Sequence, residues 1–420
     1  MVWMTAAEAL HVLNVRPQTL YANVSRGKIR AKSDADDPRR SLYHRDDILR
    51  MARRSNGRRK IETVSAQAMQ WGDPVLPSAL STAADGRLLY RGLDAVTLSA
   101  TATLEDIADL LWQADRGQVL AATAAAASIA TASASAAITR PASALGAGLL
   151  ALALRSATDA PSLGRPAAEL RAEAAGVLAT LTAAMTAVPT PADNSGGAAP
   201  TDGKRANTGA RQAITSAPST ATISRRLALA WQRPAAEDLL RRALVLMADH
   251  ELNASTFATR VAVSTGASLA AGVLAGFTTL TGPLHGGASA EFAQLVASAR
   301  QHGAGPAVQA WLSSGRPLPG FGHKLYAEGD PRARALLDLL PKLQPHTNLA
   351  AEAEAQAGEL PNIDFALTLL AAAHELPDDA PFILFALGRC VGWLAHALEQ
   401  VQANRLIRPR ARYVGPSAGT

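Results

Sequence analysis

The chain of 420 residues is long enough for two or three domains and a large buried core. Hydrophobic residues make up 48% of it and aromatic residues only 4%, and alanine is abundant, so we expect an all-α protein rather than a sheet-rich one. The single cysteine, Cys390, excludes an internal disulfide and a cysteine-rich metal site, which makes the cytoplasm the expected compartment.

The formal net charge of +6 is concentrated near the N-terminus. Residues 1–60 hold fourteen Lys or Arg and six Asp or Glu, a surplus of +8, and the remaining residues carry a net charge of −2. The first turns contain Glu8, His11 and Arg16 instead of an apolar signal core, so neither secretion nor import is indicated. The basic segment is compatible with a nucleic-acid partner.

Residues 1–54 read as a small separate domain. Met4–Val15 suits a first helix, with Thr5 as its N-cap and Glu8 at the reciprocal capping position. A turn that ends at Pro17 leads to a second helix closed by Gly27. The pattern resembles the winged helix-turn-helix domains of MerR-like and excisionase-like regulators.

That resemblance implies a DNA-binding surface. The residues expected at the groove-facing start of the second helix are Gln18, Thr19 and Tyr21, and those expected near phosphates are Arg26, Lys28, Arg39 and Arg40. A protein-docking module with a solvated basic face is the alternative interpretation. Residues 55–70 are expected to be a linker.

The region from about 71 to 225 contains no predicted site. An amphipathic helix capped at Thr103, with Ile107, Leu110 and Leu111 at helical spacing, is expected, and the Tyr90-Arg91-Gly92 element is expected to fix a loop. Residues of about 189–215 are rich in Ala, Gly and Pro and lack apolar periodicity, so we expect a flexible insertion.

A cluster of charge-capable residues follows the next helical stretch. Asp249, His250 and Glu251 lie beside Asn253, and burying them is costly unless they are paired or functional. A core histidine held by neighbouring carboxylates is the structural alternative. The uncharged stretch Val261–Leu284 is long enough to span a membrane, but its small residues favour a buried helix pair or an oligomer seam.

His285 lies in GPLHGGASAE, where glycines precede a helix-like segment. The positive end of a helix dipole disfavours an imidazolium, so this histidine is expected to be neutral at pH 7 and to donate a hydrogen bond. That property suits an electrophile that stabilises a developing enolate.

His323 lies in GFGHKLYAEGDPRA, just ahead of Arg332. A hydrogen-bond donor beside a guanidinium suits a substrate that has both a carbonyl and a carboxylate. For both histidines the alternative is a turn histidine among solvated charges.

Two further segments carry candidate groups. Asp364 lies in LPNIDFAL at the start of an apolar helix, where partial desolvation raises the basicity of a carboxylate, although a plain N-cap is the alternative. Arg389 and His396 lie two turns apart on one predicted helix, and His396 is expected to pack inside the protein.

The four motifs, in this order and spacing, resemble those of the citrate synthase family over about Trp71 to Gly415. The resemblance implies a helical fold for residues 71–420, with a small subdomain of approximately 300–390. It also implies that Asp364 is the catalytic base, that His285 and His323 are electrophiles, and that the substrate-binding residues are His250, Arg332, Arg389 and Arg408.

The implied reaction condenses acetyl-CoA with oxaloacetate and water to give citrate and CoA, with acetyl-CoA as cosubstrate, no permanently bound cofactor, no metal and no membrane. The family also implies a homodimer in which Arg408 reaches the partner's site, with Arg410 as a close competitor. Ser289 and Met247 depart from many family members, so a 2-methylcitrate synthase that uses propionyl-CoA is an alternative. A DNA-binding regulator that uses the synthase body as a metabolite sensor is another.

Overall fold

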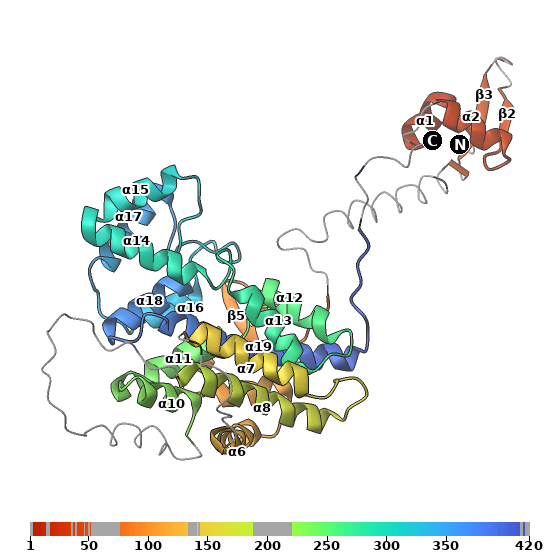
Figure 1. Cartoon of the computed structure of the whole chain (residues 1–420). Helices are drawn as coiled ribbons and strands as arrows, with labels where there is room; N and C mark the ends of the chain where they lie inside the picture. Colours follow the sequence, from red (N-terminus) through yellow and green to blue (C-terminus); the bar gives the residue numbers. More distant parts are fainter. Residues whose placement is uncertain are drawn as a thin grey trace, which may run out of the picture. The chain divides into compact units, whose positions relative to one another are not determined.

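The computed structural model describes residues 3–13, 17–34, 37, 40–45, 47–48, 51, 76–132, 141, 143–187, 221–411 and 415. The expected linker 55–70, the expected insertion at about 189–215 and Arg39 lie outside the described residues. The chain divides into two compact units, one drawn from residues 1–77 and 410–420 and the other spanning Ser78–Pro409 (Figure 1).

The N-terminal unit combines two helices with a three-stranded antiparallel sheet of order β1-β3-β2. Its elements are β1 (Trp3–Met4), α1 (Ala6–Leu13), α2 (Pro17–Ser25), β2 (Ala31–Ser33) and β3 (Ser41–His44). Thr5 and Glu8 form the predicted reciprocal cap, because each side chain accepts a hydrogen bond from the other residue's backbone N–H. Leu20, Ile29 and Tyr43 are buried in a small core of the unit's own.

The larger unit begins with a second antiparallel sheet, formed by β4 (Ser81–Ala84), β5 (Arg87–Tyr90) and β6 (Leu93–Asp94). Asp85 and Gly86 both have positive φ, 51° and 70°, at the turn between β4 and β5. The all-α expectation is therefore right for the helical body but misses this sheet, because four-residue strands give too short an alternation to recognise.

Helices make up most of the remaining described residues of this unit. Their bounds are α4 (Ala95–Ser99), α5 (Leu104–Trp112), α6 (Gln118–Ala132), α7 (Ala144–Thr158), α8 (Ala167–Thr186), α10 (Ile223–Ala230), η2 (Pro234–Ala236), α11 (Glu237–Met247), α12 (Ala254–Val263), α13 (Leu269–Leu280), α14 (Ala288–His302), α15 (Ala304–Ser313), α16 (Pro331–Leu337), α17 (His346–Ala357), α18 (Ile363–Ala373) and α19 (Ala380–Ala403). The cap at Thr103 forms as predicted, paired reciprocally with Asp106.

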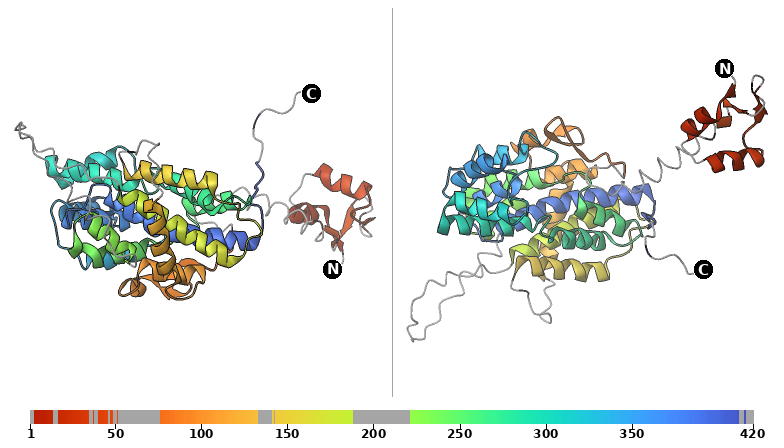
Figure 2. Two further views of the ribbon diagram at one scale, coloured as in Figure 1. Left: turned by 60° about the horizontal axis from the view of Figure 1, so that its bottom comes forward. Right: turned by 90° about the horizontal axis from the view of Figure 1, so that it is seen from above.

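Helix α19 is the centre of the body (Figure 2). It packs against α5, α8, α11, α12, α13 and α18. Among the described helices it alone has the length and apolar composition to cross a membrane, and 94% of its most apolar stretch is buried inside the protein. The uncharged stretch from Val261 to Leu284 contains the end of α12 and all of α13, which pack on each other as the helix-pair interpretation expects.

A second group of helices, α14, α15 and α17, packs together away from the central helix (Figure 1). Helix α18 contacts α14, α16 and α19, so it connects this group to the body. The loops that precede α14, α16 and α18 carry His285, His323 and Asn362.

Candidate active site

His250 lies in a tight turn between α11 and α12 that polar contacts hold on both sides. The carboxylate of Asp249 accepts hydrogen bonds from the Ser81 hydroxyl and from Nε2 of His396, 3.2 Å away. Glu251 has φ of 53°, and its carboxylate accepts hydrogen bonds from the Thr82 hydroxyl and the Ala83 N–H. Strand β4 therefore fixes the turn that aims the His250 ring.

Tyr90 closes the end of the helix that leads into this turn. Its fully buried hydroxyl lies 3.0 Å from the Val245 carbonyl and 3.2 Å from the Leu246 carbonyl at the C-terminal end of α11. It also accepts a hydrogen bond from the Asp249 N–H at 3.3 Å. The Arg91 guanidinium likewise donates to the Leu111 carbonyl at the end of α5, so the Tyr90-Arg91-Gly92 element has the structural role expected from the sequence.

Three rings meet at His250. Its Nε2 lies 2.9 Å from the Tyr326 hydroxyl, and its ring centroid lies 5.0 Å from that of His323. Burial, reinforced by the positive charges of Arg332 and Arg389, lowers the pKa of His250 well below its usual value. The ring is neutral at physiological pH.

His323 is also neutral, because burial first and the Arg332 charge second lower its pKa to about 4. Its Nδ1 accepts a hydrogen bond from the Leu325 N–H at 3.2 Å. A neutral ring with an accepting Nδ1 carries its proton on Nε2, so His323 offers one N–H donor.

Arg332 is anchored by the residue that caps its own helix. Its guanidinium donates two hydrogen bonds to the Asp330 carboxylate, at 3.0 and 2.8 Å, and both residues are 3% exposed. Asp330 also accepts from the Ile363 N–H at 3.1 Å, one residue before Asp364. Burial works against the ionised carboxyl, but Arg332 outweighs it and the pKa of Asp330 is lowered.

His285 belongs to a neighbouring cluster. Its Nε2 lies 2.8 Å from the Ser255 hydroxyl, and its ring lies edge-on to Phe385 with 5.9 Å between centroids. Burial, followed by the Arg389 charge, lowers its pKa to about 4. The predicted neutral state holds, but burial and a cation are its causes in place of the helix dipole.

Arg389 connects the two clusters. Its guanidinium lies 5.1 Å from the Phe385 ring, and its Nε donates to the Met247 carbonyl at 3.1 Å. Burial lowers the pKa of Arg389 to about 10, with the Asp249 charge opposing the shift, so it stays a cation at neutral pH. His250, His285, His323 and Asp364 all feel its charge.

Asp364 is a basic carboxylate rather than a cap. Asn362 is the N-cap of α18, since its side chain accepts from the Asp364 N–H at 3.0 Å, so the N-cap alternative for Asp364 is wrong. The Asp364 Oδ1 atom is buried and has no hydrogen-bond partner among the described residues. Burial raises its pKa to about 7 against the opposing charges of Arg332 and Arg389.

The residues predicted for catalysis and substrate binding thus fall into one connected region, except for Arg408. His250, His323 and Arg332 form one cluster, His285 another, and Arg389 and Asp364 share charged neighbours with them. Arg408 is exposed in the extended segment after α19, and within the part of the chain that the structure describes no hydrogen bond or ion pair joins it to these residues. The described residues include no group of three or more His, Cys, Asp or Glu that could hold a metal ion.

Several site residues were not predicted from the sequence. Tyr326, Ser255 and Phe385 contact the three histidines, and Asp330 fixes Arg332. Only Asp330 carries a recognisable signal, because Asp followed by Pro is a typical helix start. Ser255 and Phe385 lie on helices far from His285 in sequence.

Comparisons with known proteins point to one family. The family model described as "Citrate synthase, C-terminal domain" matches residues 68–410. "Citrate synthase 2" of Bacillus subtilis is 38% identical over 197 residues, covering 44% of this chain and 52% of that protein. The citrate synthase of Haloferax volcanii is 39% identical over 185 residues, covering 41% of this chain and 49% of that protein. The chain therefore spans about half the length of the curated relatives that it matches.

Solved structures show the same helical fold. The citrate synthase of Thermotoga maritima matches with a TM-score of 0.63 and 23% identity, over 84% of this chain and 97% of that one. The enzyme of Thermoplasma acidophilum, solved in a ternary complex with carboxymethyl coenzyme A and oxaloacetate, matches with a TM-score of 0.62 and 24% identity, over 83% of this chain and 96% of that one.

Proposed function

Because the chain belongs to the citrate synthase family, we propose that it condenses acetyl-CoA with oxaloacetate and water to give citrate and CoA. The observation that carries this proposal is the Asp364 carboxyl, whose pKa of about 7 is combined with neutral imidazoles and two buried guanidinium groups. A carboxylate of that basicity takes a proton efficiently at neutral pH. Forming a carbon–carbon bond next to a thioester requires such a base.

In the proposed mechanism Asp364 removes a proton from the methyl group of acetyl-CoA. His285 donates a hydrogen bond to the thioester oxygen and stabilises the enolate that forms. The enolate carbon then bonds to the ketone carbon of oxaloacetate, and the Nε2–H of His323 stabilises the negative charge on the ketone oxygen by a hydrogen bond. That oxygen takes up, through solvent, the proton that Asp364 removed from the methyl group, so both side chains end as they began. Water attacks the thioester carbonyl of the product, and the CoA thiol leaves.

The substrate anchors are the buried cations. Arg332 and Arg389 are proposed to bind the carboxylates of oxaloacetate through charge-assisted hydrogen bonds, with His250 beside the 2-oxo group. Arg408 is proposed to complete the site of a partner subunit in a homodimer. The helices of approximately residues 300–390 are proposed to close over the bound substrates as the small subdomain and exclude water.

The choice of acyl-CoA is the finer part of the proposal. Ser289 is buried at the start of α14, and Met247 is buried where α11 meets Gly388 of α19. We favour acetyl-CoA over propionyl-CoA, although a single methylene is discriminated only modestly.

The test is an assay of thiol release with oxaloacetate and each acyl-CoA in turn. Faster turnover with acetyl-CoA is expected, and faster turnover with propionyl-CoA would assign a 2-methylcitrate synthase. No turnover with either would overturn the enzyme proposal.

For the helix-turn-helix domain predicted at residues 1–54, we propose DNA binding. Helix α2 exposes Gln18, Thr19 and Tyr21, and Tyr21 is 54% exposed although it is a large aromatic residue. Arg26, Lys28 and Arg40 are exposed as well, and Arg39 extends the proposed set from the sequence. Such a surface fits base contacts from the helix and phosphate contacts from the cations.

Fluorescence anisotropy with sheared genomic DNA tests this proposal. Binding that weakens steeply with salt is expected, and Tyr21→Ala is expected to weaken it. Salt-independent binding, or none, would favour the protein-docking interpretation. Tight DNA binding combined with no thiol release would favour the regulator over the enzyme.

A further inference from the structure

A cavity of about 620 Å³ lies in the helical body, apart from the clusters described above. It is lined by the N-terminal end of α8, the C-terminal end of α19 and Trp112 of α5. Leu170, Leu398 and Val401 give it an apolar wall. Its volume lies within the range of roughly 300–1,000 Å³ typical of small-molecule sites.

The charge of the lining is one-sided. Arg165 and Arg171 are its charged members, Gln402 and Asn404 are neutral amides, and the described residues that line it include no Asp or Glu. The Nε atom of Arg171 is buried and has no hydrogen-bond partner among the described residues. A buried guanidinium nitrogen without an acceptor is costly, so an anion at this position would be stabilised.

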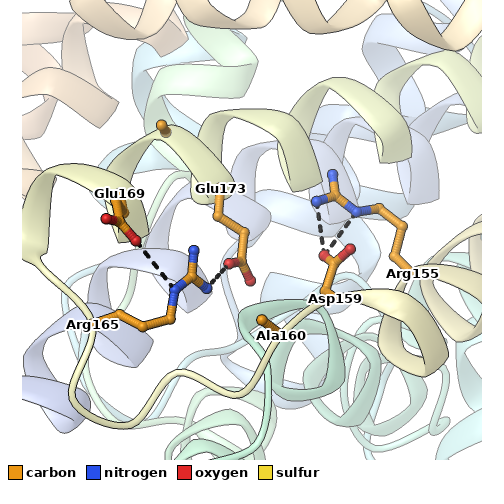
Figure 3. A pocket seen from close by; sticks show the side chains of 7 residues that line it. Arg155, Asp159, Ala160, Arg165, Glu169 and Glu173 are labelled. Atoms are coloured by element: carbon orange, nitrogen blue, oxygen red, sulfur yellow. Dashed lines mark hydrogen bonds and ion pairs between the residues drawn. The ribbon is translucent and has the colours of Figure 1, made fainter.

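The adjacent pocket of about 370 Å³ gives the contrast (Figure 3). There Arg165 pairs with Glu169 and Glu173, and Arg155 lies 2.7 Å from Asp159. These ion pairs neutralise the charges of the smaller pocket. Because Arg165 is paired there, its charge is already compensated. Arg171 is the cation of the larger cavity that no ion pair neutralises within the described part of the chain.

The start of α8 adds a second favourable feature. The N-cap of this 20-residue helix is Pro166, which makes no side-chain hydrogen bond to the first turn, and Glu169, the acidic residue of that turn, pairs with Arg165. Ala167 lines the cavity, so uncapped N–H groups and the positive end of the helix dipole lie at its edge. The chemistry of the cavity is therefore a cationic rim over an apolar wall.

We propose that this cavity binds a small organic anion with an apolar or aromatic body, its acidic group on Arg171 and its body against Trp112 and Leu398. The site contains none of the residues proposed for condensation. Its test therefore does not depend on the synthase activity.

The probe is 8-anilinonaphthalene-1-sulfonate, titrated by fluorescence against the full chain. Arg171→Gln is expected to weaken binding about tenfold, as the loss of one charge-assisted contact implies. Arg116→Gln removes the same charge from an exposed turn and serves as the control, with binding unchanged. Ala167→Trp, at an exposed position, is expected to fill the cavity and reduce binding without touching the core.

Displacement separates an anion site from a merely apolar cavity. Naphthalene-1-sulfonate is expected to displace the probe at lower concentration than uncharged 1-naphthol. Equal displacement by the two, or equal probe affinity in Arg171→Gln and the control, would overturn the proposal. Probe binding that increases as a dimer is diluted into monomers would also overturn it, because a second copy would then be the occupant.

Discussion

The Nε2 atom of His285 lies 2.8 Å from the Ser255 hydroxyl, which also accepts a hydrogen bond from the Trp393 indole at 3.0 Å. The single hydroxyl proton has two possible acceptors, Nε2 of His285 and the side-chain oxygen Oδ1 of Asn253, which lies 2.7 Å away. When it points to Nε2, the neutral imidazole carries its own proton on Nδ1. When it points to Asn253, His285 instead donates its Nε2–H to Ser255, so the direction of the Ser255 hydroxyl sets the tautomer of His285.

Ser255→Ala is expected to lower kcat by up to about 100-fold, because the ring loses both its orientation and its preferred tautomer. The KM for oxaloacetate should change little, since within the described part of the chain no hydrogen bond joins Ser255 to Arg332 or Arg389. Steady-state kinetics provide the measurement. Thr279→Ala, which removes a hydroxyl bonded within α13, is the control, and equal kcat values in the two variants would contradict this role.

Asp364→Ala is expected to abolish condensation while oxaloacetate binding is largely kept. General-base catalysis contributes about 10²- to 10⁴-fold, so the loss of rate should be at least of that order. Isothermal titration calorimetry with oxaloacetate gives the second readout. Lost oxaloacetate affinity in this variant would show that Asp364 is an anchor instead.

The pH dependence of the reaction should report Asp364. Its pKa is raised to about 7, so kcat/KM is expected to rise with pH through about 7 and then level off as the carboxylate forms. The same raised pKa makes the free energy of unfolding fall, rather than rise, as the pH increases. The folded state binds the Asp364 proton more tightly than the unfolded state does. The contribution of this proton to stability is therefore complete below about pH 4 and is lost as the pH rises to about 7.

Asp364→Asn separates these two effects. It should remove the stability loss between about pH 4 and 7 that the carboxyl causes, and it should abolish the activity limb near pH 7. Chemical denaturation at several pH values measures the first effect. An activity profile in the parent that is flat from pH 6 to 8 would be incompatible with Asp364 as the base.

Arg332→Ala is expected to weaken oxaloacetate binding about 10- to 100-fold through the loss of a charge-assisted contact. It also leaves Asp330 buried without its partner, which costs roughly 3–5 kcal/mol of stability. Calorimetry and denaturation measure the two losses separately. The double variant Asp330→Asn with Arg332→Ala should recover much of the stability but none of the affinity, and recovered affinity would exclude Arg332 as an anchor.

His346→Phe is expected to stabilise the fold. His346 is 2% exposed between Phe292 and Phe365, with ring centroids 6.0 and 5.7 Å away, and neither ring nitrogen has a hydrogen-bond partner among the described residues. A phenyl ring of similar shape removes two buried unsatisfied groups, a gain of about 1–2 kcal/mol. Denaturation at pH 7 checks this value.

Lowering the pH should enlarge the stability difference between the His346→Phe variant and the parent protein. Burial and the charge of Arg300 lower the pKa of His346 to about 4, so the parent loses stability as pH falls from about 6.5 through 4, and the phenylalanine variant does not lose this contribution. His302→Phe, at an exposed position on α14, is the control and should change little. A destabilised His346→Phe variant would mean that the ring nitrogens are satisfied in solution.

The helical body and the chemistry-bearing residues were accessible from the sequence for a simple reason. Glycine-flanked histidines and arginines near helix starts are local patterns, and four of them in order restrict the family strongly. The neutrality of His285 also followed from its chemistry, although its cause did not. Burial against Phe385 and the charge of Arg389 depend on packing between helices about a hundred residues apart.

The other features of the site could not be predicted from the sequence, because they depend on which side chains contact one another and not on residue type. Asn362 and Asp364 are both plausible caps in the sequence, and only the direction of the Asn362 side chain decides between them. Ser255 looks like an ordinary residue of the first turn of α12, yet it contacts His285. The short β4–β5 hairpin was missed because its strands lack the length at which alternation becomes informative.

That hairpin sets a limit on how the polypeptide can be divided. Ser81, Thr82 and Tyr90 grip the turn around His250 from a segment some 160 residues upstream. A shortened protein that begins at α4 would keep every proposed catalytic side chain. It would lack the hydrogen bonds from Ser81, Thr82 and Tyr90 that hold the turn around His250. Any autonomous catalytic fragment must therefore start ahead of Ser81.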